Sequence, residues 1–363
     1  MKEYSNYENI SRRLETMTKT NPFTLTFGKS PNKIISRYEY ASETIDTFQS
    51  KTPISHAYLI EGVRGSGKTV LMTTIEKQLA QEKNWIIIDL NSTQDLLTDF
   101  AMRLVDSCKN LTDILKKGFN FSVAGFSVGL NGEEQNRNNV SVICELLDKL
   151  KKKNKKILIT IDEVINGDNM KHFASEFQIL LRKDYPIFLI MTGLYENIYA
   201  IQNDPALTFL LRTPKIQLEP LSLSQIAKTY QNVFKTNIEM SKKLAKTTKG
   251  YAFAFQALGL LYYDYKDSLS LEKIISKFDD LLDDFVYRKI WQGLSENDQK
   301  VILAITDSKS QVSAVCKKLG MTSSTFSKYR ERLLNRGIIQ APQHGYVEII
   351  LPRFAELAKY YAE

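Results

Sequence analysis

The stretch that most constrains this chain runs from Gly62 to Thr69, reads GVRGSGKT and fits the pattern G-x-x-x-x-G-K-[ST]. Glycines allow a loop to approach an anion closely, and successive backbone N–H groups then point at the oxygens of that anion. A helix that starts at the end of the loop adds the partial positive charge of its N-terminus. About one chain in a hundred of this length matches the pattern by chance, so the flanking sequence has to support it.

The flanking sequence supplies strand, loop and helix in the required order. Residues 57–60 form a short apolar run typical of a strand, and residues 70–80 have helical apolar spacing. We therefore expect a nucleoside triphosphate to bind here, with Lys68 at its β- and γ-phosphates and the Thr69 hydroxyl as a ligand of Mg²⁺. The expected nucleotide-binding residues are Gly62, Val63, Arg64, Gly65, Ser66, Gly67, Lys68, Thr69 and Val70.

A second motif lies well downstream, where residues 157–163 read as a mostly apolar strand that ends in Asp162 and Glu163. Buried parallel strands have this composition, and ligands bind in the crevice at their carboxyl ends. We expect Asp162 to hold Mg²⁺ through water. Glu163 is expected to orient or deprotonate the water that attacks the γ-phosphate. An apolar strand ending in two acids is weak evidence by itself and strong evidence after a phosphate loop.

Two further polar residues follow at the ends of expected core elements. Thr192 lies near the end of a buried strand over residues 185–193, where it either senses the γ-phosphate or simply ends the strand. Arg212 precedes the last expected core strand, at 215–218. An arginine there either reaches a nucleotide bound by a neighbouring subunit or forms a surface ion pair. Arg212 could therefore contact another copy of this chain or a different protein.

Composition narrows the class of protein. The chain has 363 residues, a net charge of +8 and a pI near 9.0, which permits a nucleic-acid partner without requiring one. Its three cysteines are far apart and form no C-x-x-C, as in a reduced, cytoplasmic protein. Its three histidines have no metal-ligand spacing. We expect neither a secretory signal nor a membrane span, because there is no N-terminal apolar segment and no apolar run near the required length of about 18 residues.

Residues 118–132 differ from the rest of the first half, because apolar side chains alternate there with small or polar ones. This pattern predicts a two-stranded hairpin with one apolar face. The hairpin is either an insertion folded over the sheet or a protruding element that contacts DNA or another subunit. The lysine-rich run at 149–156 is better explained by the end of a helix than by a nucleic-acid site.

The last part of the chain predicts two helical regions. Helical periodicity extends over residues 222–290 and indicates an all-α lid. Beyond it, Ser295 caps a helix, a second helix at 312–319 ends at Gly320, and a third, recognition-type helix begins near Thr322. A short hairpin then follows. Helix, glycine turn, helix and hairpin together predict a winged helix-turn-helix domain.

The third of these helices has a basic and hydroxyl-rich composition. Its lysine and arginines outnumber a single glutamate, and serines and threonines crowd its first turn, where a recognition helix meets base edges and phosphates. Winged helices also contact proteins, so double-stranded DNA and a protein surface both remain possible partners. The residues expected to contact DNA are Ser323, Ser324, Thr325, Lys328, Tyr329, Arg330 and Arg332.

Taken in this order, the motifs resemble those of an AAA+ ATPase of the origin-recognition type. Residues 21–28 (NPFTLTFG) and 160–164 (TIDEV) are similar to a little-characterised bacterial group of these ATPases. The resemblance covers residues 21–355. It implies a five-stranded parallel core, ATP and Mg²⁺ between the core and the lid, and DNA contact by the winged helix. It also implies that the region around residues 35–40 borders the adenine.

One departure from the resemblance concerns the lid. Origin-recognition proteins often carry a lid arginine that senses the γ-phosphate, and residues 251–255 (YAFAF) contain none. The chain in this respect is closer to the related STAND signalling ATPases, which act as slow switches. Two functions follow: an ATPase that hydrolyses ATP slowly and binds DNA according to its ATP state, or a signalling or scaffold switch whose winged helix contacts protein.

The expected architecture is therefore α/β, with a P-loop parallel-sheet AAA+ core, an all-α lid and a C-terminal winged helix-turn-helix domain. The expected boundaries are an N-terminal arm at 1–22, the core at 23–218 with its insertion at 118–132, the lid at 219–291 and the winged helix at 292–363.

Overall fold

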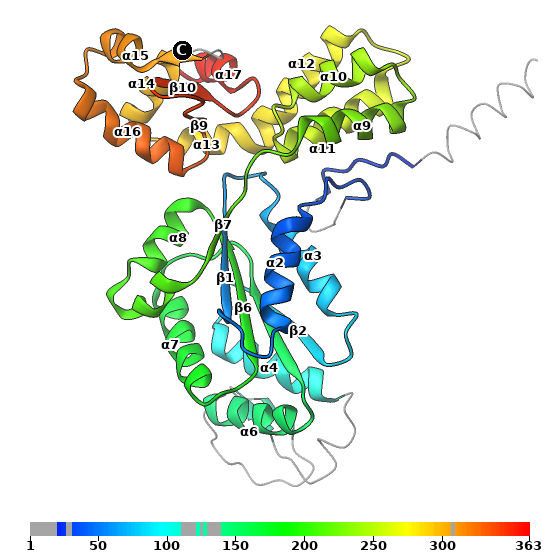
Figure 1. Ribbon diagram of the computed structural model, residues 1–363, viewed down its shortest axis with the longest axis vertical. Helices are drawn as coiled ribbons and strands as arrows, with labels where there is room; N and C mark the ends of the chain where they lie inside the picture. Colours follow the sequence, from blue (N-terminus) through cyan, green and yellow to red (C-terminus); the bar gives the residue numbers. More distant parts are fainter. Residues whose placement is uncertain (1–19, 27–30, 110–120, 124–125, 129–138, 306–308) are drawn as a thin grey trace, which may run out of the picture. The chain divides into compact units, whose positions relative to one another are not determined.

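The chain divides into two compact units (Figure 1). One is continuous in sequence and spans Arg37–Glu219, whereas the other combines Pro220–Glu363 with the N-terminal residues up to Ser36. The computed structural model describes residues 20–26, 31–109, 121–123, 126–128, 139–305 and 309–363. Most of the expected N-terminal arm therefore lies outside the described residues. In the described ranges, no helix combines the length and the apolar character needed to cross a bilayer.

The continuous unit is built on a five-stranded sheet in the order β2-β5-β6-β1-β7, and every neighbouring pair is parallel. This confirms the expected parallel core. The strands are β1 (Ala57–Glu61), β2 (Trp85–Leu90), β5 (Lys156–Ile161), β6 (Ile187–Gly193) and β7 (Lys215–Gln217).

Helices cover both faces of this sheet, because its strands are apolar on both sides. On one face Tyr58 and Ile60 of β1 pack with α2 (Tyr38–Gln49) and α3 (Lys68–Leu79). On the other face Ala57 and Leu59 belong to a larger apolar core. The elements that contribute to that core include α4 (Leu96–Lys109), α6 (Asn139–Lys152), α7 (Asp168–Arg182), α8 (Tyr195–Gln202) and the 3₁₀ segment η1 (Pro205–Arg212).

The expected hairpin insertion is present in its central part. Strands β3 (Phe121–Val123) and β4 (Phe126–Val128) pair antiparallel, with Phe121 opposite Val128. The rest of the segment predicted at 118–132 lies outside the described residues.

The second unit begins with a bundle of helices, as the periodicity predicted. Its helices are α9 (Leu223–Phe234), α10 (Ile238–Thr247), α11 (Ala252–Tyr265) and α12 (Leu271–Leu282), followed by the π-helical turn η2 (Asp283–Tyr287) and α13 (Arg288–Gln292).

An N-terminal residue completes the core of this bundle. Phe23 is buried and packs against the rings of Tyr230, Phe234 and Phe255. It also lies flat against Gly259, where an added Cβ would be 2.6 Å from the Phe23 ring. The described residues 23–26 and 31–36, which we expect in the nucleotide-binding core, belong instead to the helical unit, because Phe23 fits between its helices.

The C-terminal part contains the helices and the hairpin expected of a winged helix, with two additional elements. The expected elements are α14 (Glu296–Ala304), α15 (Val312–Leu319), α16 (Ser323–Asn335), β9 (Ile339–Gln340) and β10 (Tyr346–Ile349). The additional elements are the short β8 (Ser310–Gln311), which pairs with β10, and the final helix α17 (Phe354–Tyr361). Gly320 ends α15 with a φ of 64°, as expected for a glycine cap.

Polar contacts join this C-terminal part to the helical bundle within the same unit. Arg353 forms a bidentate ion pair with Asp279 of α12, at 2.8 and 2.7 Å. The Lys249 ammonium donates to the Ile349 carbonyl at 3.0 Å. The buried Tyr287 hydroxyl donates to the Pro352 carbonyl at 2.7 Å. Lid helices and C-terminal domain thus pack as parts of one unit.

Candidate nucleotide site and recognition helix

The two nucleotide motifs meet because β1, β6 and β5 are neighbours in the sheet. All three run parallel, so their carboxyl ends lie at the same edge. The phosphate loop leaves β1 there, while Ile60 of β1 lies opposite Thr192 of β6 and Ile161 of β5 lies opposite Met191. Asp162 follows Ile161 directly and is therefore brought next to Thr192.

The backbone of the loop explains its glycines. Gly65 and Gly67 have φ values of 76° and 94°, which side-chain-bearing residues rarely adopt. Gly67 is also the N-cap of α3, so the loop leads directly into a helix N-terminus. At Gly62 an added Cβ would lie 2.7 Å from the Ser66 Oγ. The positive φ values favour glycine at positions 65 and 67, whereas a side chain at position 62 would require the Ser66 hydroxyl to move.

The ammonium of Lys68 folds back onto the loop. Its Nζ donates to the carbonyl oxygens of Gly62 at 2.9 Å and Val63 at 3.1 Å. Burial lowers the pKa of Lys68 to about 8, although the nearby carboxylates of Asp162 and Glu163 act in the opposite direction. This cation is half-sheltered from water at the place where a phosphate would contact the loop.

Asp162 connects the phosphate loop with the neighbouring strand. Its Oδ2 accepts a hydrogen bond of 2.7 Å from the Thr69 hydroxyl, and its Oδ1 accepts one from the Thr192 hydroxyl. A hydroxyl and a carboxylate are oxygen ligands of the kind that Mg²⁺ prefers. The described residues contain no cluster of three or more His, Cys, Asp or Glu side chains suited to a metal ion. A magnesium ion here would therefore take its remaining ligands from phosphate and water.

Glu163 has an unusual backbone for a glutamate. Its φ is 52°, in the left-handed region, and its side chain is exposed. The conformation is held by its own N–H, which donates to Asp162 Oδ1 at 3.1 Å and to the Thr192 hydroxyl at 3.3 Å. Strained residues of this kind concentrate at functional sites.

Two residues near the loop lie outside both motifs: Arg37, in the region that the resemblance implies borders the adenine, and Glu196, for which the sequence indicates no role. The Arg37 guanidinium, just before α2, donates from Nη2 to the Ser66 carbonyl at 3.1 Å. Glu196, in the first turn of α8, lies close enough to Lys68 to act against the lowering of its pKa. No motif marks either residue, because both approach the loop from elements distant in sequence.

Arg212 lies at the end of η1 and is exposed, as is its neighbour Leu211. Within the described part of the chain, Arg212 forms no ion pair or hydrogen bond, so the structure provides no partner for the expected surface ion pair. A contact with another subunit stays a prediction.

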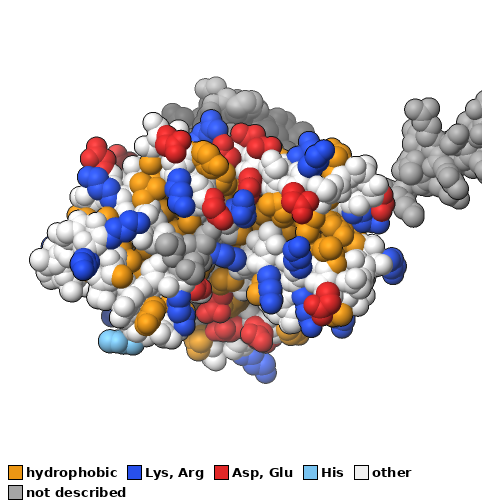
Figure 2. Space-filling model, turned by 90° about the horizontal axis from the view of Figure 1, so that it is seen from above, with side chains coloured by type: hydrophobic (Ala, Val, Ile, Leu, Met, Phe, Trp, Pro, Cys, Tyr) orange, Lys and Arg blue, Asp and Glu red, His pale blue; other side chains and the backbone are white. Residues whose placement is uncertain are grey.

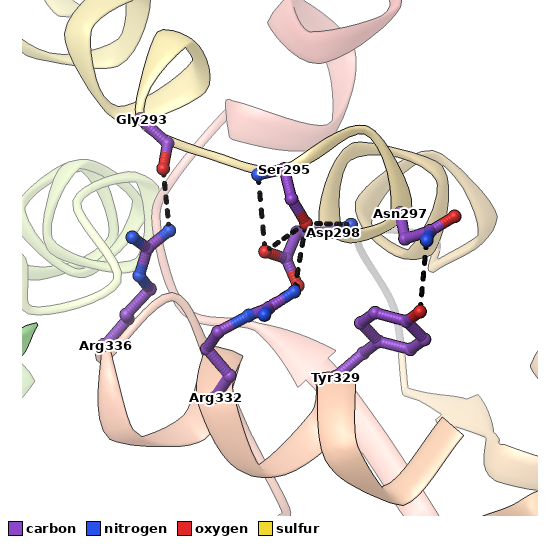
Figure 3. Close-up of polar contacts among 7 residues, drawn as sticks. All are labelled: Gly293, Ser295, Asn297, Asp298, Tyr329, Arg332 and Arg336. Atoms are coloured by element: carbon purple, nitrogen blue, oxygen red, sulfur yellow. Dashed lines mark hydrogen bonds and ion pairs between the residues drawn. The ribbon is translucent and has the colours of Figure 1, made fainter. Parts of the chain in front are cut away.

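The expected recognition helix α16 turns part of its polar surface toward α14 (Figure 3). Arg332 donates to Asp298 Oδ1 at 2.6 and 3.1 Å and to the Ser295 hydroxyl at 2.9 Å. The Tyr329 hydroxyl accepts a 3.0 Å hydrogen bond from the Asn297 amide. Arg336 donates to the Gly293 carbonyl at 3.0 Å.

These contacts bear on the expectation for DNA. Tyr329 and Arg332, which we expected to contact DNA, also hold α16 against α14, because side chains three and four positions apart share one helix face. Their contact with DNA stays a prediction. The first turn of α16 keeps the expected exposure at Ser323, Ser324 and Thr325. Of the expected basic residues, Lys328 is exposed and Arg330 is half-buried.

The charge of +8 does not gather on the face drawn in Figure 2. There, the Lys and Arg side chains of the described residues are interspersed with Asp and Glu.

Comparisons with known proteins agree with the fold. Residues 284–357 match a family described only as a domain of unknown function, DUF8462. No curated protein matches the chain.

Several solved structures are similar over most of the chain. The Aeropyrum pernix ORC2 protein, solved as ADPNP-ADP complexes, is 14% identical with a TM-score of 0.59, covering 92% of this chain and 96% of that one. Cdc6p from Pyrobaculum aerophilum is 14% identical over 93% of this chain and 96% of its own, with a TM-score of 0.49. The Aeropyrum pernix ORC1 protein in complex with DNA is 14% identical over 90% and 93%, with a TM-score of 0.45.

The likeness to ORC2 shows the fold. Together with the five-stranded parallel sheet and the helices of the second unit, it means that this chain has the α/β fold of origin-recognition AAA+ proteins.

Proposed function

We propose that this chain is an AAA+ ATPase that binds ATP with Mg²⁺ and hydrolyses it slowly, and that its ATP state controls contact with double-stranded DNA. The observation that carries the nucleotide half is the 2.7 Å hydrogen bond between Thr69 and Asp162. It joins the ends of two motifs that are 93 residues apart, and the closeness of the two expected magnesium ligands supports a magnesium site here.

The residues divide the chemistry among them. Lys68 and the N–H groups of the loop hold the phosphates, while Thr69 and Asp162 hold the magnesium ion, which neutralises phosphate charge when bound. Glu163 accepts the proton of the attacking water or orients that water. Thr192 reports the state of the γ-phosphate to Asp162, since its hydroxyl already bonds to that carboxylate.

Slow hydrolysis is supported by what surrounds Glu163. Its side chain is exposed, and in the described chain it has no hydrogen-bond partner that would fix it for proton transfer. The lid turn at 251–255 offers aromatic residues and no arginine. We propose that Arg212 supplies the missing cation from a neighbouring subunit, because it is exposed and unpaired within the described residues.

A binding and turnover experiment tests the nucleotide half. Lys68→Ala should abolish ATP binding in calorimetry, whereas Lys51→Ala, which removes an exposed lysine in the same unit, should bind as the parent does. Glu163→Gln should bind ATP normally and lose hydrolysis. Undiminished phosphate release by Glu163→Gln would remove Glu163 from the mechanism.

The proposed contact with DNA is supported by the exposed first turn of α16 and by Lys328 and Arg330, which follow that turn. Lysine and arginine contacts to phosphates release counterions, so DNA affinity should fall steeply with salt. We expect a salt-dependent shift of duplex DNA that is lost in the double variant Lys328→Ala/Arg330→Ala. Arg182→Ala, an exposed position at the end of α7, is the matched control.

A second function is favoured by the inward contacts of α16. Arg332, one of the basic residues expected to contact DNA, is already paired with Asp298, and the Tyr329 hydroxyl is already bound to Asn297. A signalling or scaffold switch, in which the C-terminal domain contacts a protein, needs fewer basic groups. Absence of any DNA shift in the presence of ATP, at low salt, would favour this switch.

A further inference from the structure

The contact between Arg37 and Ser66 concerns a single peptide group of the phosphate loop. Arg37 lies outside the motif, at the N-cap position of α2, and its Nη2 donates to the Ser66 carbonyl at 3.1 Å. The Ser66 carbonyl and the Gly67 N–H belong to the same planar trans peptide, so they point in opposite directions. Whatever holds the carbonyl on one side therefore holds the Gly67 N–H on the other.

This peptide is unusually free to turn over. A flip changes the φ of Gly67, now 94°, to a value of opposite sign, and glycine tolerates both signs about equally well. Neighbouring glycine at position 65 adds further freedom. The sequence that makes the loop tight thus also lets it present a carbonyl where a phosphate needs an N–H.

The Gly67 N–H is available to donate a hydrogen bond to a ligand. Within the described chain it has no hydrogen-bond acceptor, unlike the Ser66 N–H, which donates to the Val63 carbonyl at 3.1 Å. A fixed N–H without an acceptor at the start of α3 is suited to an anion.

Arg37 is suited to holding the peptide. Its guanidinium is half-buried, and burial lowers its pKa while the nearby Tyr40 and Glu219 act in the opposite direction. No ion pair to Arg37 exists among the described residues, so the charge is directed at the loop rather than neutralised by a carboxylate. A charged donor on the carbonyl also polarises the peptide and strengthens the N–H as a donor.

We propose that Arg37 is a positioning residue that locks the Ser66–Gly67 peptide with its N–H directed at the phosphates of the nucleotide. The proposal rests on the proposed function and adds a residue outside both motifs to the site. It treats Arg37 as acting through the loop and not as touching the base or the ribose.

The test compares side chains of similar length at position 37 and two ligands. Arg37→Met removes the donor, and Arg37→Lys keeps one. We expect Arg37→Met to weaken binding of both Mg-ATP and Mg-bound inorganic triphosphate, by roughly tenfold or more, as for one charge-assisted hydrogen bond. Arg37→Lys should recover most of this loss, and Arg182→Met should bind as the parent does.

Two results with Arg37→Met would overturn the proposal. Unchanged affinity for both ligands in Arg37→Met would overturn the proposal. A loss confined to ATP, with inorganic triphosphate unaffected, would also overturn it, because it would mean a direct contact with the base or ribose. If Arg37→Met does not fold, as judged by its unfolding transition, Arg37→Gln replaces it and the same comparison applies.

A readout without nucleotide separates this proposal from the proposed function. The amide resonance of Gly67 should shift and broaden in Arg37→Met as the peptide samples both directions, and it should stay sharp in Arg182→Met. A parent protein that does not bind ATP would contradict the proposed function, while the Gly67 resonance would still test the lock. An unaltered Gly67 resonance in Arg37→Met would contradict the lock alone.

Discussion

The guanidinium of Arg332 lies 2.6 Å from the carboxylate of Asp298, which is only 1% exposed. Asp298 also accepts from the Ser295 hydroxyl at 2.8 Å and forms the capping box at the start of α14. One buried carboxylate thus fixes both the N-terminus of α14 and the face of α16 (Figure 3).

This relationship predicts a structural role for Arg332. Arg332→Ala should lower the free energy of unfolding by about 1–3 kcal/mol, because it leaves a buried carboxylate short of a partner; the 43% exposure of the Arg332 side chain keeps the cost below that of a fully buried pair. Urea denaturation measures the change. Arg332→Ala/Asp298→Asn should be less destabilised than the sum of the two single variants. Strict additivity would mean that the pair is not coupled.

The lowered pKa of Lys68 predicts a pH dependence of ATP binding. A bound phosphate favours the charged ammonium and raises its pKa, so affinity is complete below about pH 8 and falls as the pH rises through that value. One pH unit above it, affinity should be about tenfold lower. Titration calorimetry at several pH values measures this. Phosphate loses its last proton near pH 6 and does not interfere.

The control for this dependence is Lys68→Arg, whose guanidinium stays charged throughout. Its affinity, whatever its absolute value, should be flat across the same pH range. A matching decline in Lys68→Arg would assign the titration to another group.

The backbone of Glu163 predicts a trade between stability and activity. With its φ at 52°, Glu163→Gly should raise the free energy of unfolding by up to about 1 kcal/mol, because glycine adopts this conformation without strain. Glu163→Gln should leave stability unchanged. Both variants should lose hydrolysis. Thermal unfolding and phosphate release, measured on the same samples, separate the two effects, and a destabilised Glu163→Gly would contradict the strain argument.

The contact between Phe23 and Gly259 predicts an overpacking effect. An alanine at 259 would place its Cβ 2.6 Å from the buried Phe23 ring, so Gly259→Ala should destabilise the helical unit by about 1–3 kcal/mol. Gly293→Ala, where the nearest atoms are 3.5 Å away, is the matched control. Phe23→Leu should relieve much of the Gly259→Ala penalty. No difference between the two alanine variants in urea denaturation would contradict this packing.

The fold was predictable where local chemistry decides it. Residue type alone predicts the positive φ at Gly67 and Gly320. It likewise predicts the capping box at Ser295. The strands of the parallel core are continuous apolar runs. Because these strands are parallel, the polar residues that follow them lie at the same edge of the sheet. The start of α4 follows the same rule, because Asp95 caps its first turn by accepting from the Thr98 N–H at 2.8 Å.

The features that the sequence does not predict depend on contacts between residues that are distant in sequence. Nothing near Arg37 indicates the Ser66 carbonyl, and Phe23 has no local sign that its partners lie beyond residue 230. The face of α16 that contacts α14 could be predicted in part. Tyr329 lies three positions after the buried Phe326 and therefore shares its face. Counting charges along a helix without assigning them to faces does not predict the ion pair of Arg332 with Asp298.

The position of Phe23 has a consequence for how the chain folds during synthesis. The nucleotide-binding unit is one continuous stretch, Arg37–Glu219, and can fold as soon as it has left the ribosome. The helical unit cannot, because its N-terminal piece emerges first and must wait for the aromatic residues of α9 and α11 to be made. Phe23 is therefore made long before the rings of Tyr230, Phe234 and Phe255 that cover it, and its apolar side chain stays exposed to water until those residues have been made.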